Sequence, residues 1–182
     1  MVEGVWRTRV GYAGGAAERP TYRAMADHTE CFQVDFDPTV VTFEDLLELF
    51  WQSHDPTREP WKVQYASLVL AHDADQLAAA RESAERVSGF LGRRVATRIE
   101  ELTTFWPAED YHQKYHLRQD RVLAAEYRAI FGDDEVALRE STSAMKANAF
   151  VATRPGAAVV DRYAGRLGLG DAGLARLGAS RG

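Results

Sequence analysis

Alternation of apolar and polar residues near the start of the chain predicts two strands. Successive side chains alternate in character over residues 5–12, and the glycines at 14–15 end the pattern. The segment HTECFQVDF, residues 28–36, alternates in the same way. A period of two residues places alternate side chains on opposite faces of a strand. Glu30 therefore shares a face with Phe32 and with the apolar residues that follow at the same spacing.

Helical spacing and a further apolar run predict the rest of the elements. The segment 42–55 carries an apolar stripe, and Thr42 with Asp45 makes a capping-box pattern at its start. The near-continuous apolar run at 63–71 is typical of a buried strand. Beyond it the pattern predicts a helix over 73–91, a strand over 93–102 and a helix of about six turns over 108–131. A shorter helix is predicted over 134–147 and another near 158–167, in a Gly/Ala-rich tail whose end is expected to fray.

The order of these elements indicates an α+β fold. Two strands come first, then a helix, a strand, a helix and a strand, and helices complete the chain. Ferredoxin-like sheets follow the order β-α-β-β-α-β. Aligned with that order, the chain predicts a ferredoxin-like mixed sheet flanked by helices, with the first strand and helix of the core missing. We divide it into an N-terminally incomplete domain at 1–131 and a helical extension with a flexible tail at 132–182.

Composition excludes several classes of function. The formal net charge is −5 and the basic residues are scattered, which argues against nucleic-acid binding. No apolar run reaches the roughly 20 residues that cross a bilayer, and no secretory signal precedes the first strand. We therefore expect a cytoplasmic protein with no membrane partner. Cys31 is the only cysteine, which rules out an intrachain disulfide and a multi-thiolate metal site.

Six short motifs follow one another in the order GYAGG, PTY, HTE, LLELFWQSHDPT, VQYAS and AEDYHQKY. Each motif alone is weak, but the ordered set over residues 4–117 resembles the A-type peptide-methionine sulfoxide reductases, which reduce the S epimer of methionine sulfoxide. The resemblance implies an oxidoreductase of protein repair, with methionine sulfoxide, free or in peptides, as its substrate. It implies no bound cofactor, no metal, and an external thiol such as thioredoxin or dithiothreitol as the reductant.

The resemblance also implies roles for three residues. Glu30 of HTE matches the glutamate that protonates the sulfoxide oxygen, and Tyr22 and Tyr65 match tyrosines that hydrogen-bond the same oxygen. Pro60 stands where the family has an acidic residue shortly before the second tyrosine. A carboxyl group among apolar side chains favours its neutral form, which suits a proton donor. The alternative is a solvated or Arg-paired carboxylate at a strand end, with tyrosines that only pack in the core.

The family's nucleophile, the cysteine of an N-terminal Gly-Cys-Phe-Trp motif, has no counterpart in this sequence. Three explanations stay open. In the first, the natural protein carries the motif upstream of Met1. In the second, the chain is a non-catalytic relative that binds sulfoxide or peptide or acts as a structural module. In the third, Cys31 is the nucleophile. Neighbouring strand residues point to opposite faces, so Cys31 is expected to point away from Glu30. We therefore interpret Cys31 as structural.

Glu109, His112 and His116 have the spacing that presents metal ligands on one face of a helix. No second helix offers a matching set of ligands. We interpret the three residues as a polar helix face and predict no metal site.

Overall fold

The computed structural model describes residues 2–180, which form two compact units. The sheet unit consists of residues 2–5 and 10–108, and the helical unit consists of residues 6–9 and 109–180. Strand β1, Val5–Ala13, contributes residues to both units. Among the described helices, none has both the length and the apolar character needed to cross a membrane.

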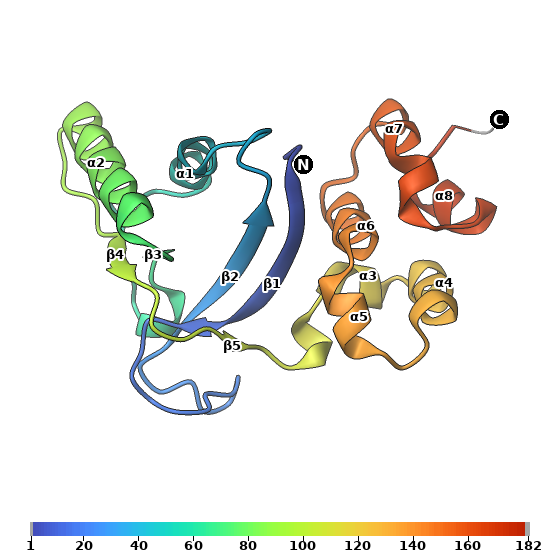
Figure 1. The fold of residues 1–182 in the computed structure, drawn as a ribbon, viewed down its shortest axis with the longest axis horizontal. Helices are drawn as coiled ribbons and strands as arrows, with labels where there is room; N and C mark the ends of the chain where they lie inside the picture. Colours follow the sequence, from blue (N-terminus) through green and yellow to red (C-terminus); the bar gives the residue numbers. More distant parts are fainter. Residues whose placement is uncertain (1, 181–182) are drawn as a thin grey trace. The chain divides into compact units, whose positions relative to one another are not determined.

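The larger sheet has three strands in the order β2-β1-β5 (Figure 1). Strand β2 is Thr29–Phe36, and the short strand β5 is Trp106–Pro107. β1 and β5 are antiparallel, and Tyr12 lies opposite Trp106. Both β1 and β2 agree with the alternating pattern of the sequence, whereas β5 is too short to produce a pattern.

A second sheet is a parallel pair of two short strands, β3 at Leu68–Ala71 and β4 at Arg98–Glu101. Both strands are shorter than the predictions at 63–71 and 93–102, because the leading residues make other contacts. Residues Val63–Tyr65 form a 3₁₀ turn, η1, and the backbone N–H of Ala96 donates to Pro56 O at 2.7 Å. The mixed α+β class is confirmed. The ferredoxin-like core with its missing strand and helix stays a prediction.

Two helices of the sheet unit begin where the sequence predicts, and α2 also ends there, whereas α1 ends three residues before the predicted segment does. Helix α1, Phe43–Gln52, starts at Thr42, whose side chain accepts from the backbone N–H of Asp45 in a complete capping box. Helix α2, Ala74–Leu91, starts at a capping Asp73 and ends at Gly92, which has a left-handed conformation at φ +61°.

A small buried cluster of the sheet unit contains Tyr12, Met25 and Ala108. The larger core cluster of the unit lies between these helices and the β3-β4 pair. Its buried members are Leu47, Trp51, Val69, Ala80 and Ala84. The apolar stripe of α1 and the small residues of α2 account for four of the five. Burying such a stripe is what stabilises an amphipathic helix in a folded protein.

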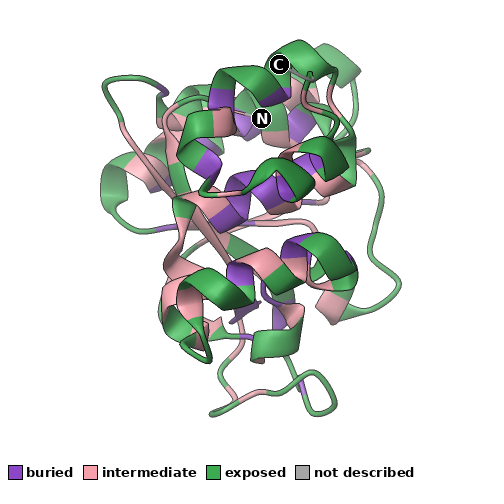
Figure 2. Cartoon of the chain, turned by 90° about the vertical axis from the view of Figure 1, so that its right-hand side faces the viewer, coloured by how far each residue is buried: buried purple, intermediate pink, exposed green. Residues whose placement is uncertain are grey.

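The helical unit contains η2 at Asp110–His112, α3 at Tyr115–Gln119, α4 at Arg121–Phe131, α5 at Glu135–Glu140, α6 at Thr142–Thr153, α7 at Ala157–Leu167 and α8 at Asp171–Leu177. Buried and exposed positions both occur along the helices in Figure 2, although η2 and α5 contain no buried residue. Their buried positions form a separate core that includes Leu117, Leu123, Tyr127, Phe150, Val160 and Leu167.

The prediction of one long helix over 108–131 is wrong. Lys114 has a left-handed backbone at φ +52°, which separates η2 from α3. Asp120 then ends α3 and caps α4 by accepting from the backbone N–H groups of Val122 and Leu123. The helix predicted over 134–147 is likewise two helices, because Ser141 caps α6 directly after α5.

Candidate functional site

The three residues predicted to hold the sulfoxide oxygen all lie in the sheet unit and are all exposed. Glu30 is the second residue of β2. Tyr65 ends η1, and Tyr22 lies in the loop before β2; each tyrosine is 47% exposed. All three side chains can therefore be reached, at least in part, from solvent.

A hydrogen bond between buried Thr29 and η1 brings the segments of Glu30 and Tyr65 together. Thr29 is 1% exposed, and its hydroxyl donates to Val63 O at 2.8 Å. This bond fixes the turn that carries Tyr65 beside the start of β2, one residue before Glu30. Tyr22 lies on a different turn, which is closed by backbone hydrogen bonds between Thr21 and Ala24.

The loop that carries Tyr22 is held at both ends. The Asp27 carboxylate accepts from the backbone N–H groups of Ala16 at 2.7 Å and Ala17 at 3.2 Å. These two bonds favour the charged form and lower the pKa of Asp27. The ring of His28, buried at 1% exposure, bonds Ala17 O through Nε2 at 2.7 Å. The loop therefore closes on residues that immediately precede β2.

The surroundings of Glu30 differ from the apolar environment that the alternating pattern predicts. Glu30 is exposed and its face neighbour Phe32 is 66% exposed, whereas Thr29 is buried and Cys31 is half-buried. The face that is covered at the start of β2 is therefore the opposite one. The Thr29 hydroxyl has the Val63 carbonyl as its partner, so this polar side chain can be buried at little cost.

Cys31 lies in the covered part of β2. Its thiol is 3.7 Å from Gly11 O on the neighbouring strand. Burial disfavours the thiolate and raises the pKa of Cys31 to about 11. The thiolate is the nucleophilic form of cysteine, so near neutral pH this side chain is a poor nucleophile.

An aromatic contact between Tyr65 and Trp61 was not predicted from the sequence. The rings of Trp61 and Tyr65 stack with their centroids 5.2 Å apart and an interplanar angle of 30°. The Lys62 ammonium lies 4.7 Å from the centroid of the Trp61 ring. The spacing of four residues between the two aromatic residues is the signal that could have indicated this contact.

The residues considered as metal ligands do not form one helix face. Glu109 precedes η2, His112 ends it, and His116 follows the left-handed Lys114 in α3. The helix on which that idea depended is interrupted. Within residues 2–180, no group of three His, Cys, Asp or Glu side chains has an arrangement that could hold a metal ion.

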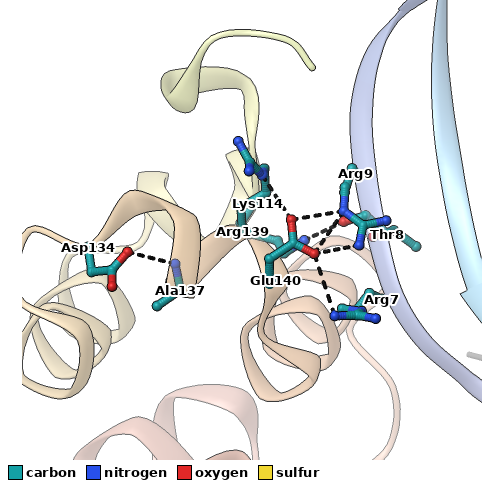
Figure 3. Close-up of polar contacts among 8 residues, drawn as sticks. All are labelled: Arg7, Thr8, Arg9, Lys114, Asp134, Ala137, Arg139 and Glu140. Atoms are coloured by element: carbon teal, nitrogen blue, oxygen red, sulfur yellow. Dashed lines mark hydrogen bonds and ion pairs between the residues drawn. The ribbon is translucent and has the colours of Figure 1, made fainter. Parts of the chain in front are cut away.

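The strongest charge cluster of the helical unit surrounds Glu140 (Figure 3). Arg9 Nε lies 2.8 Å from both carboxylate oxygens of Glu140, and Arg139 Nε lies 3.0 Å from Oε1. Arg7 adds an ion pair at 3.7 Å. The hydrogen bond from Arg9 is the largest of the effects that lower the pKa of Glu140 to about 2. This cluster joins residues 6–9 to α5 within the helical unit.

Buried Lys114 lies beside the same cluster. It is 5% exposed, and its ammonium donates to Thr8 O at 2.6 Å (Figure 3). Burial lowers the pKa of Lys114 to about 8, and the nearby Glu140 carboxylate only partly opposes this effect. Contacts between residues more than a hundred positions apart leave no signal in a single sequence. The cluster around Glu140 and Lys114 was therefore not predicted from the sequence.

Comparison with known proteins defines the class. The family described as peptide methionine sulfoxide reductase matches residues 1–144. A Drosophila melanogaster peptide methionine sulfoxide reductase is 48% identical over 124 residues, which are 67% of this chain and 50% of that protein. The rice peptide methionine sulfoxide reductase A5 is 39% identical over 156 residues, covering 82% of this chain and 60% of that protein. Reduced Mxr1 from Saccharomyces cerevisiae has a similar structure, with a TM-score of 0.59 and 30% identity over 62% of this chain and 71% of that one.

The chain therefore belongs to the peptide methionine sulfoxide reductase family. It spans about half the length of the Drosophila relative.

Proposed function

We propose that this protein is a thiol-dependent peptide-methionine (S)-S-oxide reductase, an oxidoreductase that converts methionine S-sulfoxide to methionine. The observation that carries the proposal is the family match over residues 1–144, which includes the segments of all three predicted oxygen-binding residues. The substrate is methionine sulfoxide, free or in peptides. Two thiol groups of an external reductant, thioredoxin or dithiothreitol, supply the two electrons and become a disulfide, and the sulfoxide oxygen leaves as water.

In this proposal, Glu30 donates a proton to the sulfoxide oxygen, and the hydroxyls of Tyr22 and Tyr65 donate hydrogen bonds to it. Each of the three side chains has surface exposed to solvent. The bond from Thr29 to Val63 fixes η1 beside the segment of β2 that carries Glu30. Thr29 and Glu30 point to opposite faces of the strand, so the bond relates the two segments and not the Glu30 carboxyl itself.

The attacking thiolate comes from outside these 182 residues, which contain no cysteine besides Cys31, because Cys31 has no catalytic role in the proposal. Its thiol is partly covered and its pKa is raised to about 11, which opposes formation of the attacking thiolate. The same observation favours a second candidate function for these 182 residues, in which they bind sulfoxide or peptide without reducing it.

Two proposals concern organisation. We propose that the strands and helices of the sheet unit belong to a ferredoxin-like core. We also propose that residues 1–131 form the reductase-like domain and residues 132–182 an extension. The rice relative supports a family connection beyond the domain, since the similarity extends over 82% of this chain.

The test is the reduction of the separated S and R epimers of N-acetylmethionine sulfoxide amide by the purified chain with excess dithiothreitol. The Cys31→Ser variant is measured beside it. Binding of both epimers and of the corresponding sulfide is measured by calorimetry for the wild type, Glu30→Gln and a control, Glu82→Gln, whose carboxylate lies on the exposed face of α2.

Stereoselective binding of the S epimer that weakens in Glu30→Gln but not in Glu82→Gln supports the assigned site. Reduction of the S epimer alone that persists in Cys31→Ser supports the reductase proposal. Reduction that disappears in Cys31→Ser would make Cys31 the nucleophile and contradict its assigned structural role. Selective binding without turnover supports the second candidate for this chain. Equal binding of sulfoxide and sulfide, with no reduction, refutes both candidate functions.

A further inference from the structure

A pair of stacked aromatic side chains is exposed beside the proposed site. Trp61 is 71% exposed and Tyr65 is 47% exposed, although their ring centroids are only 5.2 Å apart. Single exposed apolar residues are common on protein surfaces, but two in contact form a continuous apolar area. Trp and Tyr are also the residues that most often dominate binding energy at interfaces.

Hydrogen bonds hold the turn at Tyr65, and the Trp61 ring packs on the Tyr65 ring. Tyr65 donates its backbone N–H to Lys62 O at 3.1 Å, and Ala66 donates to Val63 O at 3.1 Å, which closes η1. The hydrogen bond from buried Thr29 to Val63 O fixes that turn to β2. Trp61 enters the turn directly after Pro60, whose ring restricts the backbone.

We propose that Trp61 is a specificity-determining residue that contacts the side chain next to methionine sulfoxide in a polypeptide substrate. This inference rests on the proposed function, in which Tyr65 binds the sulfoxide oxygen. The proposal specifies the preferred substrate, which is methionine sulfoxide flanked by an aromatic or large aliphatic residue.

The spacing of the rings fits this assignment. Side chains on the same face of an extended peptide are about 6.8 Å apart, and adjacent Cα atoms are about 3.8 Å apart. The 5.2 Å between the ring centroids is shorter than the separation of two side chains on one face, so a substrate side chain near a sulfoxide at Tyr65 is within reach of Trp61.

Lys62 also contacts the Trp61 ring, with its ammonium 4.7 Å from the ring centroid. Both side chains are exposed, and a cation–π contact in solvent is weak. An aromatic side chain of the substrate can displace the ammonium and cover more of the exposed Trp61 surface. A flanking glycine offers no such contact.

The experiment measures binding of four fluorescein-labelled peptides to the full chain by anisotropy. The peptides carry either methionine S-sulfoxide or methionine, flanked by either phenylalanine or glycine. Proteins compared are the wild type, Trp61→Ala, Trp61→Phe and the control Phe90→Ala. Phe90 is 90% exposed on α2, so its variant removes an exposed aromatic ring at a different place. Circular dichroism of each variant checks that it is folded.

For the wild type, we expect the phenylalanine-flanked sulfoxide to bind about 3- to 10-fold more tightly than the glycine-flanked one, the range of an aromatic pair contact. Trp61→Ala should lose this flank preference and keep the preference for sulfoxide over sulfide. Trp61→Phe should retain part of the flank preference, and Phe90→Ala all of it.

The inference is overturned if the wild type shows no flank preference, or if Trp61→Ala keeps it. The proposed function fails in a different way, through equal affinity for sulfoxide and sulfide peptides, and a Trp61-dependent flank preference could persist in that case. Absence of binding by any peptide overturns both.

Discussion

At the scale of single residues, Lys114 gives the sharpest link between burial and a measurable property. Its ammonium is buried, donates to Thr8 O, and has its pKa lowered from 10.5 to about 8. In the unfolded chain the same group keeps its proton up to about pH 10.5. Between these pH values the unfolded state binds more protons at this group, so Lys114 makes the free energy of unfolding rise with pH, by at most about 3 kcal/mol. The pKa of Cys31, raised from 9.0 to about 11, has the opposite effect above pH 9.

We predict that Lys114→Met removes this rise. Urea unfolding curves at intervals from pH 7 to 10.5 measure it. Lys62→Met is the matched control, since it removes an exposed lysine and should leave the rise in place. An unchanged pH profile in Lys114→Met would show that the folded protein does not depress the pKa of this lysine.

Glu140 has the opposite dependence at acid pH. Its pKa is lowered from 4.5 to about 2, mainly by the hydrogen bond from Arg9, so its stabilisation is complete above pH 4.5 and is lost as the pH falls towards 2. We predict that Glu140→Gln lowers the free energy of unfolding at pH 7 by about 1–2 kcal/mol, since partial solvent exposure screens the ion pairs. It should also flatten the acid limb between pH 4.5 and 2.

The control is Glu82→Gln, which breaks an exposed pair with Arg86 on α2. Exposed pairs at this spacing contribute about 0.3–0.5 kcal/mol. Equal effects of the two substitutions in denaturation experiments would contradict a special role for the Glu140 cluster.

At the scale of elements, the sequence predicts helices best where local chemistry determines both ends. Thr42 and Asp45 form the cap at the start of α1, and Asp73 and Gly92 cap the two ends of α2. Each of these residues lies within a few positions of the backbone groups that it caps. The interruptions at Lys114 and Asp120 were not predicted, because tertiary contacts stabilise them. The Lys114 side chain reaches Thr8, and the Asp120 carboxylate also pairs with Arg176.

The contact between α1 and α2 provides a prediction at this scale. Trp51 Nε1 donates to Ser83 Oγ at 3.1 Å, and that hydroxyl donates to Ala80 O at 2.8 Å, all in the core of the sheet unit. Ser83→Ala leaves the buried indole N–H without this acceptor and should cost about 1–3 kcal/mol in denaturant unfolding.

A double-mutant cycle with Trp51→Phe checks the cause. Phenylalanine has no N–H to satisfy, so Ser83→Ala should cost clearly less in the Trp51→Phe background. Additive effects would mean that the loss comes from packing around Ser83 rather than from the hydrogen bond.

At the scale of the whole molecule, the sequence predicts the α+β class and the family, and it predicts the candidate site only in part. The family motifs select Tyr22, Glu30 and Tyr65. The strand pattern alone assigns Glu30 to an apolar environment, although Glu30 and Phe32 are exposed. Which face of a strand is covered depends on elements far along the chain, and in β2 the Val63 carbonyl favours burial of Thr29.

The two units also have cores that share no residue among those described. Leu167 has no exposed surface, and its carbonyl accepts from the Tyr127 hydroxyl at 2.9 Å, so the end of α7 belongs to the core of the helical unit. We predict that Leu167→Ala costs about 2–5 kcal/mol, whereas Val159→Ala, at a position 41% exposed on the same helix, costs less than about 0.5 kcal/mol.

Hydrogen exchange followed by mass spectrometry shows which segments Leu167→Ala destabilises. Because the cores are separate, Leu167→Ala should speed amide exchange in α4 and α6 and leave α2 close to its wild-type rate. Equal acceleration in α2 would mean that the chain opens as a single cooperative block. Unchanged exchange in α4 and α6 would mean that α7 does not stabilise the helical unit, and would favour a loosely attached extension.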